Sequence, residues 1–271
     1  MYGEVISTER LSAHLVRVVL GGAGLEGLTS TGDADEYVNC FFLPEDAPYP
    51  VPFEDDATRD LPRAQRPFAR RITVRRWDAE RGELTLDIAT HGEVGYAGRW
   101  ALHAQPGDRL QLRGPGGGYR PHADADSYLF VGDESALPAI AACAEAVPAG
   151  RPVVVVAEVE DADDEIAISS PGALEVHWVH RAGRTGDDAV AGLLAEAVAA
   201  LPRPAGTVSA FVHGEAASTR AVRRVLLGEA IVAEDKLSCS PYWRRGHDDE
   251  EWRAVKAAWV REVNAEVFPA R

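Results

Sequence analysis

Hydrophobic and polar residues alternate along the first part of the chain with the two-residue period of β-strands. Turn residues separate the short apolar runs, and no helical repeat longer than about two turns is found before residue 120. The pattern predicts strands over residues 14–20, 36–43, 70–77, 83–90 and 107–115. Asp78–Gly82 predicts the turn of a hairpin between two of these strands. We therefore expect a small antiparallel β-barrel or sandwich.

From residue 127 onward, apolar runs that predict strands alternate with segments that predict helices. The strands are expected over residues 127–133, 152–160, 174–181 and 207–215, and the helices over residues 134–147, 187–201, 217–228 and 248–267. The second of these strands is rich in valine, as expected for a strand that is buried on both faces. The final helix begins with acidic residues, which suit a helix N-terminus. Strands joined by helices predict a parallel α/β sheet.

The change of pattern predicts two domains, residues 1–122 and residues 123–271. The expected fold class is an N-terminal antiparallel β-barrel followed by a C-terminal α/β domain with a parallel sheet. We find no internal repeat and no low-complexity linker between the two parts.

Composition and charge narrow the possible partners. The 271 residues include 43 Asp plus Glu against 28 Lys plus Arg, and the formal net charge of -15 argues against nucleic acid or an anionic membrane as the general partner. No apolar run is long enough for a membrane span, and the first residues lack the pattern of a signal peptide. Three scattered cysteines, Cys40, Cys143 and Cys239, are expected to stay reduced. These features predict a cytoplasmic protein.

One short segment is positively charged, although the chain as a whole is negative. Residues 66–77, "RPFARRITVRRW", contain five arginines and no acid, which points to one specific anion. Side chains alternate between the faces of a strand, so Arg71, Thr73 and Arg75 are expected on one face and Arg70, Ile72 and Val74 on the other. Arginine offers paired donors that match phosphate oxygens. The alternative is a solvated, arginine-rich strand face, which this segment alone would favour.

A second segment, "HGEVGYAGRWA" (residues 91–101), is rich in small residues. Gly95, Ala97 and Gly98 would let backbone N–H groups approach a phosphate closely, and Arg99 adds positive charge. The alternative is an ordinary turn that leads into a short helix over residues 99–104.

A third segment, "VGDESALPAI" (residues 131–140), places Asp133, Glu134 and Ser135 at a turn from a strand to a helix. Ligands of open α/β sheets gather at the carboxyl ends of the strands. The alternative is that Asp133 or Ser135 only caps the helix. The histidines His177, His180 and His213 lack metal-ligand spacing, and we predict structural roles for them and no metal site.

The fourth segment, "SPYWRRGHDDEEW" (residues 240–252), brings Tyr242 and Trp243 next to Arg244 and Arg245, just before the final helix. One interpretation is that the segment packs this helix onto the domain, with the arginines paired to acids of residues 248–251. The other is that the aromatic side chains border a cofactor, while at least one arginine faces an anionic substrate.

Together, the four segments resemble motifs of the siderophore-interacting protein family, which are flavin-dependent ferric-siderophore reductases. "RRITVR" fits the family's R-x-Y-T-x-R motif, residues 91–101 resemble HG-x-x-GPAS-x-WA, "GDESALPAI" is similar to GDE[TS]ALPAI, and "YWRRG" matches the C-terminal motif. The motifs occur in the family's order and cover essentially the whole chain. The resemblance implies a fold like that of ferredoxin-NADP reductase, with an FAD-binding barrel and an NAD(P)H-reductase-like α/β domain.

The resemblance also implies roles for individual residues. Arg70 or Arg75 would bind the FAD pyrophosphate, and Thr73 would be the catalytic residue, forming a hydrogen bond near the reactive edge of the flavin ring. Arg244 and Arg245 would bind the substrate. The full set of implied cofactor contacts is Arg70, Ile72, Thr73, Val74, Arg75, His91, Gly95, Tyr96, Ala97, Gly98, Arg99, Trp100, Asp133, Glu134, Ser135, Tyr242 and Trp243.

Four positions depart from the family's motifs. Ile72 stands where a tyrosine would stack on the flavin, Tyr96 replaces a proline, Gly98 replaces a serine, and Pro241 replaces a glycine. A lost aromatic stack and a lost hydrogen bond to phosphate together predict FAD binding weaker by about 2–4 kcal/mol. Stacking by Tyr96 would offset part of this loss.

These observations support three hypotheses of different kinds. The first is an FAD-dependent reductase that converts ferric siderophores to Fe(II). The second is an enzyme of the same fold that acts on an organic metabolite, and the third is a ferric-chelate binding protein without flavin chemistry. The sequence has no GxGxxG nucleotide motif, so the electron donor stays open between NAD(P)H and reduced ferredoxin, the latter being a possible protein partner.

Overall fold

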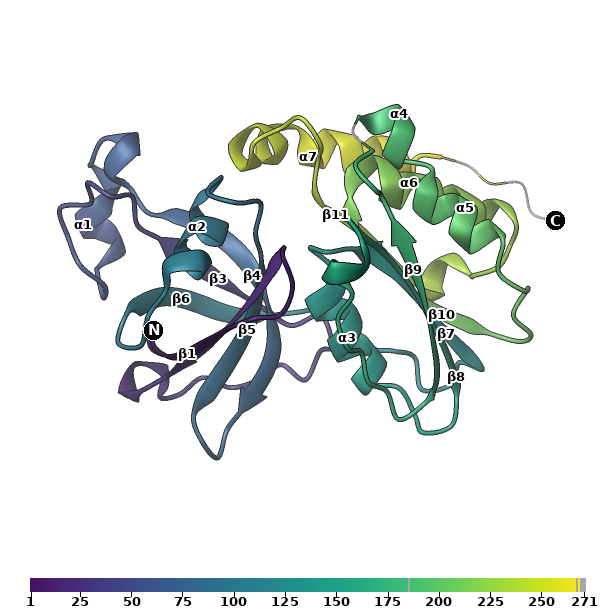
Figure 1. Cartoon of the computed structure of the whole chain (residues 1–271), viewed down its shortest axis with the longest axis horizontal. Helices are drawn as coiled ribbons and strands as arrows, with labels where there is room; N and C mark the ends of the chain where they lie inside the picture. The colour runs from purple at the N-terminus through teal and green to yellow at the C-terminus, as the bar shows by residue number, and fades with distance from the viewer. Residues whose placement is uncertain (185, 267, 269–271) are drawn as a thin grey trace. The chain divides into compact units, whose positions relative to one another are not determined.

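The computed structural model describes residues 1–184, 186–266 and 268. Figure 1 shows the chain coloured from its N-terminus to its C-terminus, with the labels that are used below. The chain divides into two compact units, Met1–Tyr119 and Arg120–Arg271. Each unit is described by itself.

The first unit is a closed antiparallel β-barrel, which confirms the predicted N-terminal fold. Its strands follow the order β1-β2-β5-β4-β3-β6 around the barrel, and they appear in purple, blue and teal in Figure 1. The strands are β1 (Tyr2–Arg10), β2 (Leu15–Gly21), β3 (Tyr37–Phe42), β4 (Phe68–Asp78), β5 (Glu83–Ala89) and β6 (Arg109–Gly116). The core of the barrel is formed by alternate residues of these strands, such as Leu84, Leu86 and Ile88 of β5.

Strand β1 was not predicted from the sequence. Val5 is its one buried branched hydrophobic residue, whereas residues 6–10 are exposed. The strand is held by its backbone pairing to β2 and β6. A strand with so few apolar side chains on its inner face leaves too weak an alternation to be recognised from the sequence.

Short helices cover parts of the barrel. They are η1 (Ala23–Leu25), α1 (Asp55–Arg59), η2 (Arg63–Gln65) and α2 (Tyr96–His103). Helix α2 packs on the barrel through Ala101, which is buried, and through Trp100, whose ring lies edge-on to Phe42 with 5.6 Å between the centroids. The predicted short helix of residues 99–104 therefore exists, but it begins three residues earlier than expected.

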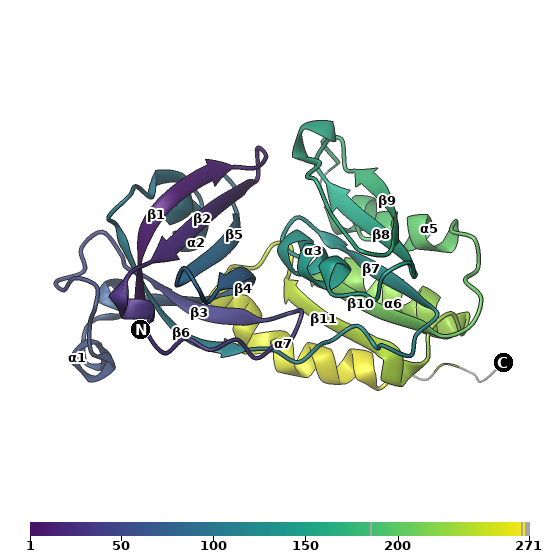
Figure 2. The same ribbon diagram turned by 90° about the horizontal axis from the view of Figure 1, so that it is seen from below.

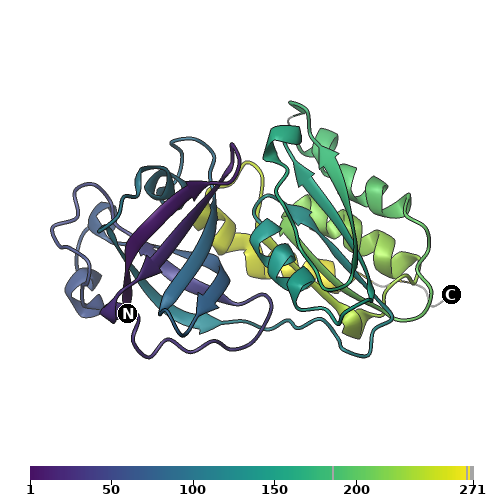
Figure 3. The same ribbon diagram turned by 60° about the horizontal axis from the view of Figure 1, so that its bottom comes forward.

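The second unit is built on a five-stranded parallel sheet, which confirms the predicted C-terminal fold. The strand order is β11-β10-β7-β8-β9, and every neighbouring pair is parallel. Figures 2 and 3 show the sheet with α3 (teal) on one face and α5 and α6 (green) on the other. The strands are β7 (Ser127–Asp133), β8 (Pro152–Val159), β9 (Ala173–His180), β10 (Val208–Glu215) and β11 (Leu237–Trp243).

The helices of this unit agree only partly with the predicted boundaries. They are α3 (Leu137–Glu145), η3 (Ala162–Asp164), α4 (Asp187–Val190), α5 (Leu193–Ala199), α6 (Ala216–Gly228), η4 (Glu234–Lys236) and α7 (Asp249–Asn264). The single helix expected over residues 187–201 is divided into α4 and α5 by the turn at residues 191–192. The final helix ends at Asn264, and its predicted last residue, 267, lies outside the described residues.

The acidic start of α7 has the role that the sequence predicted for it. The Asp248 carboxylate accepts a hydrogen bond from the Glu251 N–H (2.8 Å), and the Glu251 carboxylate accepts one from the Asp248 N–H (2.9 Å). This reciprocal capping box satisfies donors that the helix itself leaves unpaired.

Strand β11 was missed because its sequence, "LSCSPYW", mixes serines with a proline. It lies at the edge of the sheet, where a proline costs no ladder hydrogen bond on the outer side. Pro241 pairs with Gly214 of β10, and the register shifts directly after this pair. Among the helices of the described residues, none combines the length and hydrophobicity needed to cross a membrane.

Candidate functional site

Strand β4 carries the arginine-rich segment, and its register defines two faces. Arg70 and Ile72 lie opposite Cys40 and Val38 of β3. Directly opposed residues of antiparallel strands point to the same face. Because Cys40 and Val38 are fully buried in the barrel core, Arg70 and Ile72 lie on the core side of the strand. Ile72 packs against the core cluster, where the family's motif has a tyrosine.

Arg71 and Thr73 lie on the other face of β4. They are opposite Asn39 and Tyr37 of β3. The Arg71 guanidinium carbon is 5.0 Å from the centre of the Tyr37 ring, which is a cation–π contact. The alternation predicted for this strand is therefore observed up to Val74, which is buried.

A β-bulge follows Val74. Val74 pairs with Leu86, but the next pair is Arg76 with Thr85, so Arg75 is the extra residue. Arg75 stays on the outer side, with a side chain that is 15% exposed and an Nε atom 3.9 Å from the Asp87 carboxylate. The same carboxylate receives two hydrogen bonds from Arg17, at 2.7 and 2.8 Å. The sequence interpretation missed both Arg17 and Asp87.

The glycine-rich loop forms the N-terminus of α2. Gly95 is the N-cap residue, and its φ of 79° is a conformation that glycine adopts without strain. No side chain among the described residues caps this helix. The first N–H groups of α2 therefore point out of the helix end, where the helix dipole favours an anion.

The start of α2 lies beside the start of β4. The Tyr96 ring is stacked on the Phe68 ring, with the centroids 3.6 Å apart and the planes at 13°. Phe68 lies opposite Phe42 on the core side of β4, the face that also holds Arg70 two residues later. The Arg63 guanidinium carbon lies 4.0 Å from the Phe68 ring centre. One face of Tyr96 is thus already used within the barrel, which limits the stacking on flavin that was expected from it.

Gly98 has a packing role that the sequence interpretation did not include. It is buried in α2, and a Cβ atom there would lie 3.2 Å from the Thr90 Cα and 3.4 Å from the Ala89 carbonyl oxygen. The glycine therefore allows α2 to approach the end of β5 closely. A serine at this position would require the backbone to shift.

The remaining predicted residues of this loop take different positions. His91 is exposed, and Ala97 packs against the barrel core. Arg99 forms an ion pair with Glu45, at 3.2 Å. Trp100 packs on Phe42, as described above.

The start of β4 and the start of α2 offer donors of a kind that can bind a pyrophosphate. They are the Arg70 guanidinium and the N–H groups that follow Gly95, which no side chain among the described residues caps. Ile72 offers an apolar surface and no aromatic stack. The barrel unit therefore contains donors that would fit the phosphates of a dinucleotide, and an aliphatic side chain where an aromatic ring was expected.

In the second unit, Asp133 connects three strand ends. One carboxylate oxygen accepts hydrogen bonds from the Ser135 N–H (2.9 Å) and hydroxyl (2.5 Å). The other accepts from the Glu215 N–H and from the Trp243 Nε1–H, both at 2.8 Å. Helix α3 begins only at Leu137, with Ala136 as its N-cap. Asp133 and Ser135 are therefore not the N-cap of α3, and Asp133 holds β7, β10 and β11 together.

Glu134 belongs to a buried ionic network. Arg181, directly after β9, donates two hydrogen bonds to the Glu134 carboxylate, one of them at 2.8 Å. The same guanidinium lies 3.3 Å from Glu158 and 3.3 Å from Glu160. Burial, followed by the nearby Asp133 carboxylate, raises the pKa of Glu158 to about 7. One oxygen of Glu158 is buried without a hydrogen-bond partner among the described residues.

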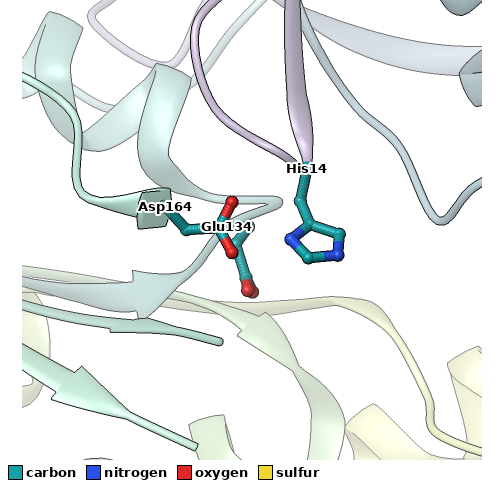
Figure 4. Close-up of side chains that lie close together, drawn as sticks. All are labelled: His14, Glu134 and Asp164. Carbon is teal, nitrogen blue, oxygen red and sulfur yellow. The ribbon is translucent and has the colours of Figure 1, made fainter. Parts of the chain in front are cut away.

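Asp164 of η3 lies near this network. It is 1% exposed, and its carboxylate has an oxygen within 4.8 Å of one on Glu134. Figure 4 shows these two side chains. His14, also drawn there, belongs to the barrel unit.

The C-terminal motif forms the end of β11 and the turn that follows. Besides binding Asp133, the Trp243 ring lies 5.3 Å from the Arg245 guanidinium carbon. The Tyr242 carbonyl accepts a hydrogen bond from Nε1 of Trp252, which is buried in α7. The Arg244 carbonyl accepts one from the His247 N–H. Tyr242 and Trp243 thus contact α7 and the strand ends, as the packing part of the first interpretation expects, whereas the pairing of the arginines with acids of residues 248–251 stays a prediction.

His213 has the structural role predicted for it. It is buried in β10, stacked on Phe211 with 3.7 Å between the ring centroids, and it contacts Ser238 through Nε2 at 3.0 Å. Burial, together with the charge of Lys256, lowers the pKa of His213 to about 3. The ring is therefore neutral at physiological pH.

Comparison with known proteins identifies the family. The family model of the siderophore-interacting FAD-binding domain matches residues 4–119, and that of the siderophore-interacting protein matches residues 125–246. The chain belongs to the siderophore-interacting protein family. An FAD-binding domain on this reductase fold makes it an FAD-dependent oxidoreductase.

Several relatives match this chain over nearly their full length. An uncharacterized protein of Mycobacterium tuberculosis is 42% identical over 266 residues, covering 93% of each chain. The ferric vibriobactin reductase ViuB of Vibrio cholerae is 35% identical over 253 residues, covering 92% of this chain and 91% of ViuB. The crystal structure of a siderophore utilization protein from T. fusca has a TM-score of 0.78 at 36% identity, covering 92% of this chain and 94% of that one.

Proposed function

We propose that this protein is a reductase of ferric siderophores, which uses bound FAD to convert Fe(III) to Fe(II). The observation that carries the proposal is the Phe68–Tyr96 stack, which joins the start of β4, the strand of the arginine-rich segment, to the N-terminus of α2, in the unit that matches an FAD-binding domain. A ferric siderophore is favoured as the substrate because a relative that matches 92% of this chain is named a ferric vibriobactin reductase.

Bound FAD would supply electrons that Fe(III) accepts, and Fe(II) is held less tightly by the hard oxygen ligands of a chelate. The chain's own residues would hold and orient the flavin. Arg70 and the first N–H groups of α2 would bind its pyrophosphate. The Thr73 hydroxyl would donate or accept a hydrogen bond at the reactive edge of the ring, and Arg75, on the same face of β4, would contact the cofactor with its positive charge.

Arg244 and Arg245 are proposed to face the anionic chelate. The Trp243 ring beneath Arg245 restricts the guanidinium without neutralising its charge. A fixed positive charge attracts an anionic chelate and accelerates its association. Because the chain as a whole has a net charge of -15, this local positive charge would also help to select an anionic substrate.

The electron donor is proposed to be NAD(P)H or a reduced ferredoxin, and the reaction is placed in the cytoplasm. The support for this compartment is the sequence, in which the three cysteines Cys40, Cys143 and Cys239 are scattered and odd in number. The two donors differ in a simple test. NAD(P)H alone bleaches the flavin spectrum of the purified protein under anaerobic conditions if it is the donor, whereas a ferredoxin-dependent protein stays oxidised until reduced ferredoxin is added.

The experiment that tests the proposed function combines FAD titration with steady-state reduction of a ferric siderophore. We expect FAD to bind in the micromolar range and Fe(II) to form only when FAD and a donor are both present. The variant Arg244→Ala/Arg245→Ala should keep its FAD affinity but show a KM for the chelate raised about tenfold, with a weaker dependence on salt. If the protein binds no FAD at high micromolar concentration, the reductase function is excluded.

One observation favours a second candidate, an enzyme of this fold that acts on an organic metabolite with weakened flavin use. Ile72 is aliphatic and packs against the barrel core, and one face of Tyr96 is covered by Phe68, so the aromatic stack that the family's motif provides is reduced. This candidate is favoured if the FAD-loaded protein is reduced by its donor but is not reoxidised by any ferric chelate.

A further inference from the structure

Asp87 is a buried carboxylate on the outer side of the barrel. It follows Leu86 and precedes Ile88, which both point into the core, so its own side chain points outward. An outward residue of a barrel strand is normally solvated, but Asp87 is only 3% exposed. Its carboxylate is covered by two arginines, Arg17 and Arg75.

The register of the barrel explains this arrangement. Arg17 of β2 lies directly opposite Asp87 of β5, and it binds both carboxylate oxygens, at 2.7 and 2.8 Å. On the other side of β5, the bulge after Val74 displaces Arg75 so that its Nε lies 3.9 Å from the same carboxylate. Asp87 thus stands between an arginine that holds it in place and an arginine of the flavin motif.

Burying a carboxylate costs free energy unless a cation or hydrogen-bond donors compensate its charge. The fork geometry of Arg17 supplies this compensation, because both of its hydrogen bonds are short and the two planar groups match. The Arg75 Nε lies 3.9 Å from the same carboxylate, which is within the range of an ion pair but longer than the Arg17 contacts. The three side chains carry a net charge of +1 on one patch of the outer barrel surface.

We propose that Asp87, held by Arg17, is a positioning residue that orients Arg75 and sets the charge next to the flavin. The inference rests on the proposed function, in which Arg75 contacts FAD. Asp87 itself does not contact the cofactor. It keeps the Arg75 guanidinium on the outer face of β4 and offsets part of the positive charge there.

This role has an electrostatic consequence that a purely structural role lacks. Reduction adds negative charge to a flavin, so nearby positive charge favours the reduced form and raises the reduction potential. Asp87→Asn removes one negative charge and should raise the potential of the bound flavin. Arg17→Gln removes one positive charge and should lower it. Loss of barrel structure alone would not produce shifts of opposite sign.

The experiment measures the reduction potential of bound FAD by dye equilibration in wild type, Asp87→Asn and Arg17→Gln. The ratio of affinities for reduced and oxidised FAD should rise on the order of tenfold in Asp87→Asn and fall by a similar factor in Arg17→Gln. Thermal unfolding of each variant separates these shifts from general destabilisation. Glu83→Gln, at the far end of β5 in an exposed ion pair with Arg81, makes the same change of charge and should leave the potential unchanged.

Shifts in the same direction, or no shift in either variant, would overturn the inference while leaving the proposed function intact. Asp87→Glu, which restores the charge, should bring the potential back toward the wild-type value. If Asp87→Asn does not fold, Arg17→Gln decides alone, because an unchanged or raised potential there contradicts the proposal. If wild type binds no FAD, the proposed function fails and the inference fails with it.

Discussion

The barrel unit and the α/β unit both contain motifs of the family, but the polar groups of these motifs make different contacts. At the start of α2 in the barrel, N–H groups point out of a helix end that has no side-chain cap, and Tyr96 of this helix stacks on Phe68 of β4. At the strand ends of the sheet, the polar atoms of the motif are bound by groups of the same unit, since Asp133 accepts four hydrogen bonds and Glu134 is paired with Arg181. A sequence signature can therefore record how a domain is held together as well as what it binds.

The largest effect that tests this comparison is expected from Asp133→Ala. The substitution removes the acceptor of two backbone N–H groups, the Ser135 hydroxyl and the Trp243 indole, so the free energy of unfolding should fall by about 3–5 kcal/mol. Urea unfolding followed by tryptophan fluorescence measures the change. Ser135→Ala, which removes a single hydroxyl, is the control and should cost about 1 kcal/mol. A stable Asp133→Ala protein with altered ligand affinity would show that this motif binds a ligand instead.

The next largest effect is expected at the barrel arginines. Arg75→Ala should weaken FAD binding by about 2–3 kcal/mol, because a charge-assisted contact to the cofactor is lost. Arg70→Ala should have a similar effect, while the free energy of unfolding of both apo variants stays within about 1 kcal/mol of wild type. FAD titration by fluorescence measures the affinity. Arg76→Ala is the matched control, since Arg76 lies on the same strand with a side chain that is 72% exposed.

A pH effect of intermediate size is expected from Glu158. Its folded-state pKa of about 7 lies above the ordinary value of 4.5, so the folded protein binds a proton that the unfolded chain has released. The stability contributed by this proton is present at low pH and is lost as the pH rises through 7, by at most about 3 kcal/mol. Arg181, Asp133 and Glu134 are the charged groups that face it.

The check is urea unfolding of wild type and Glu158→Gln between pH 5 and pH 8. The difference in unfolding free energy between the two proteins should grow with pH in favour of the variant, because the substituted glutamine carries no charge to bury. Differences that do not vary with pH would mean that Glu158 titrates normally.

The smallest effect is expected from Ile72→Tyr. Restoring an aromatic ring at the position of the family's tyrosine should tighten FAD binding by about 0.5–1.5 kcal/mol and quench flavin fluorescence through stacking. Ile72→Leu, which keeps an aliphatic side chain, is the control. Unchanged or weaker binding in Ile72→Tyr would indicate that the surface around Ile72 is shaped for another ligand.

The sequence predicted both folds because their periodicities are strong, but it predicted few of the contacts. The alternation of β4 was visible, whereas the bulge at Arg75 depends on pairing with β5 and has no local signal. Arg17 and Asp87 are 70 residues apart, and only the barrel register joins them. The one available clue was that each of two otherwise apolar strands carries a charged residue at an outward position.

The signature around Asp133 was recognised, but its chemistry was assigned to a ligand or a helix cap. Its partners Glu215 and Trp243 come from β10 and β11, and β11 was not predicted at all. Side-chain roles that depend on long-range pairing are therefore the part that sequence periodicity cannot supply.

The most direct test of the central claim is a single-turnover experiment without oxygen. The FAD-loaded protein is reduced by a chemical reductant, freed of excess reductant and mixed with a ferric siderophore while the flavin absorbance and an Fe(II) chelator are followed. The proposed function predicts that the flavin is reoxidised and that about two Fe(II) form for each FAD, since reduced FAD carries two electrons. Flavin that stays reduced in the presence of excess ferric siderophore, with no Fe(II) formed, would contradict the account.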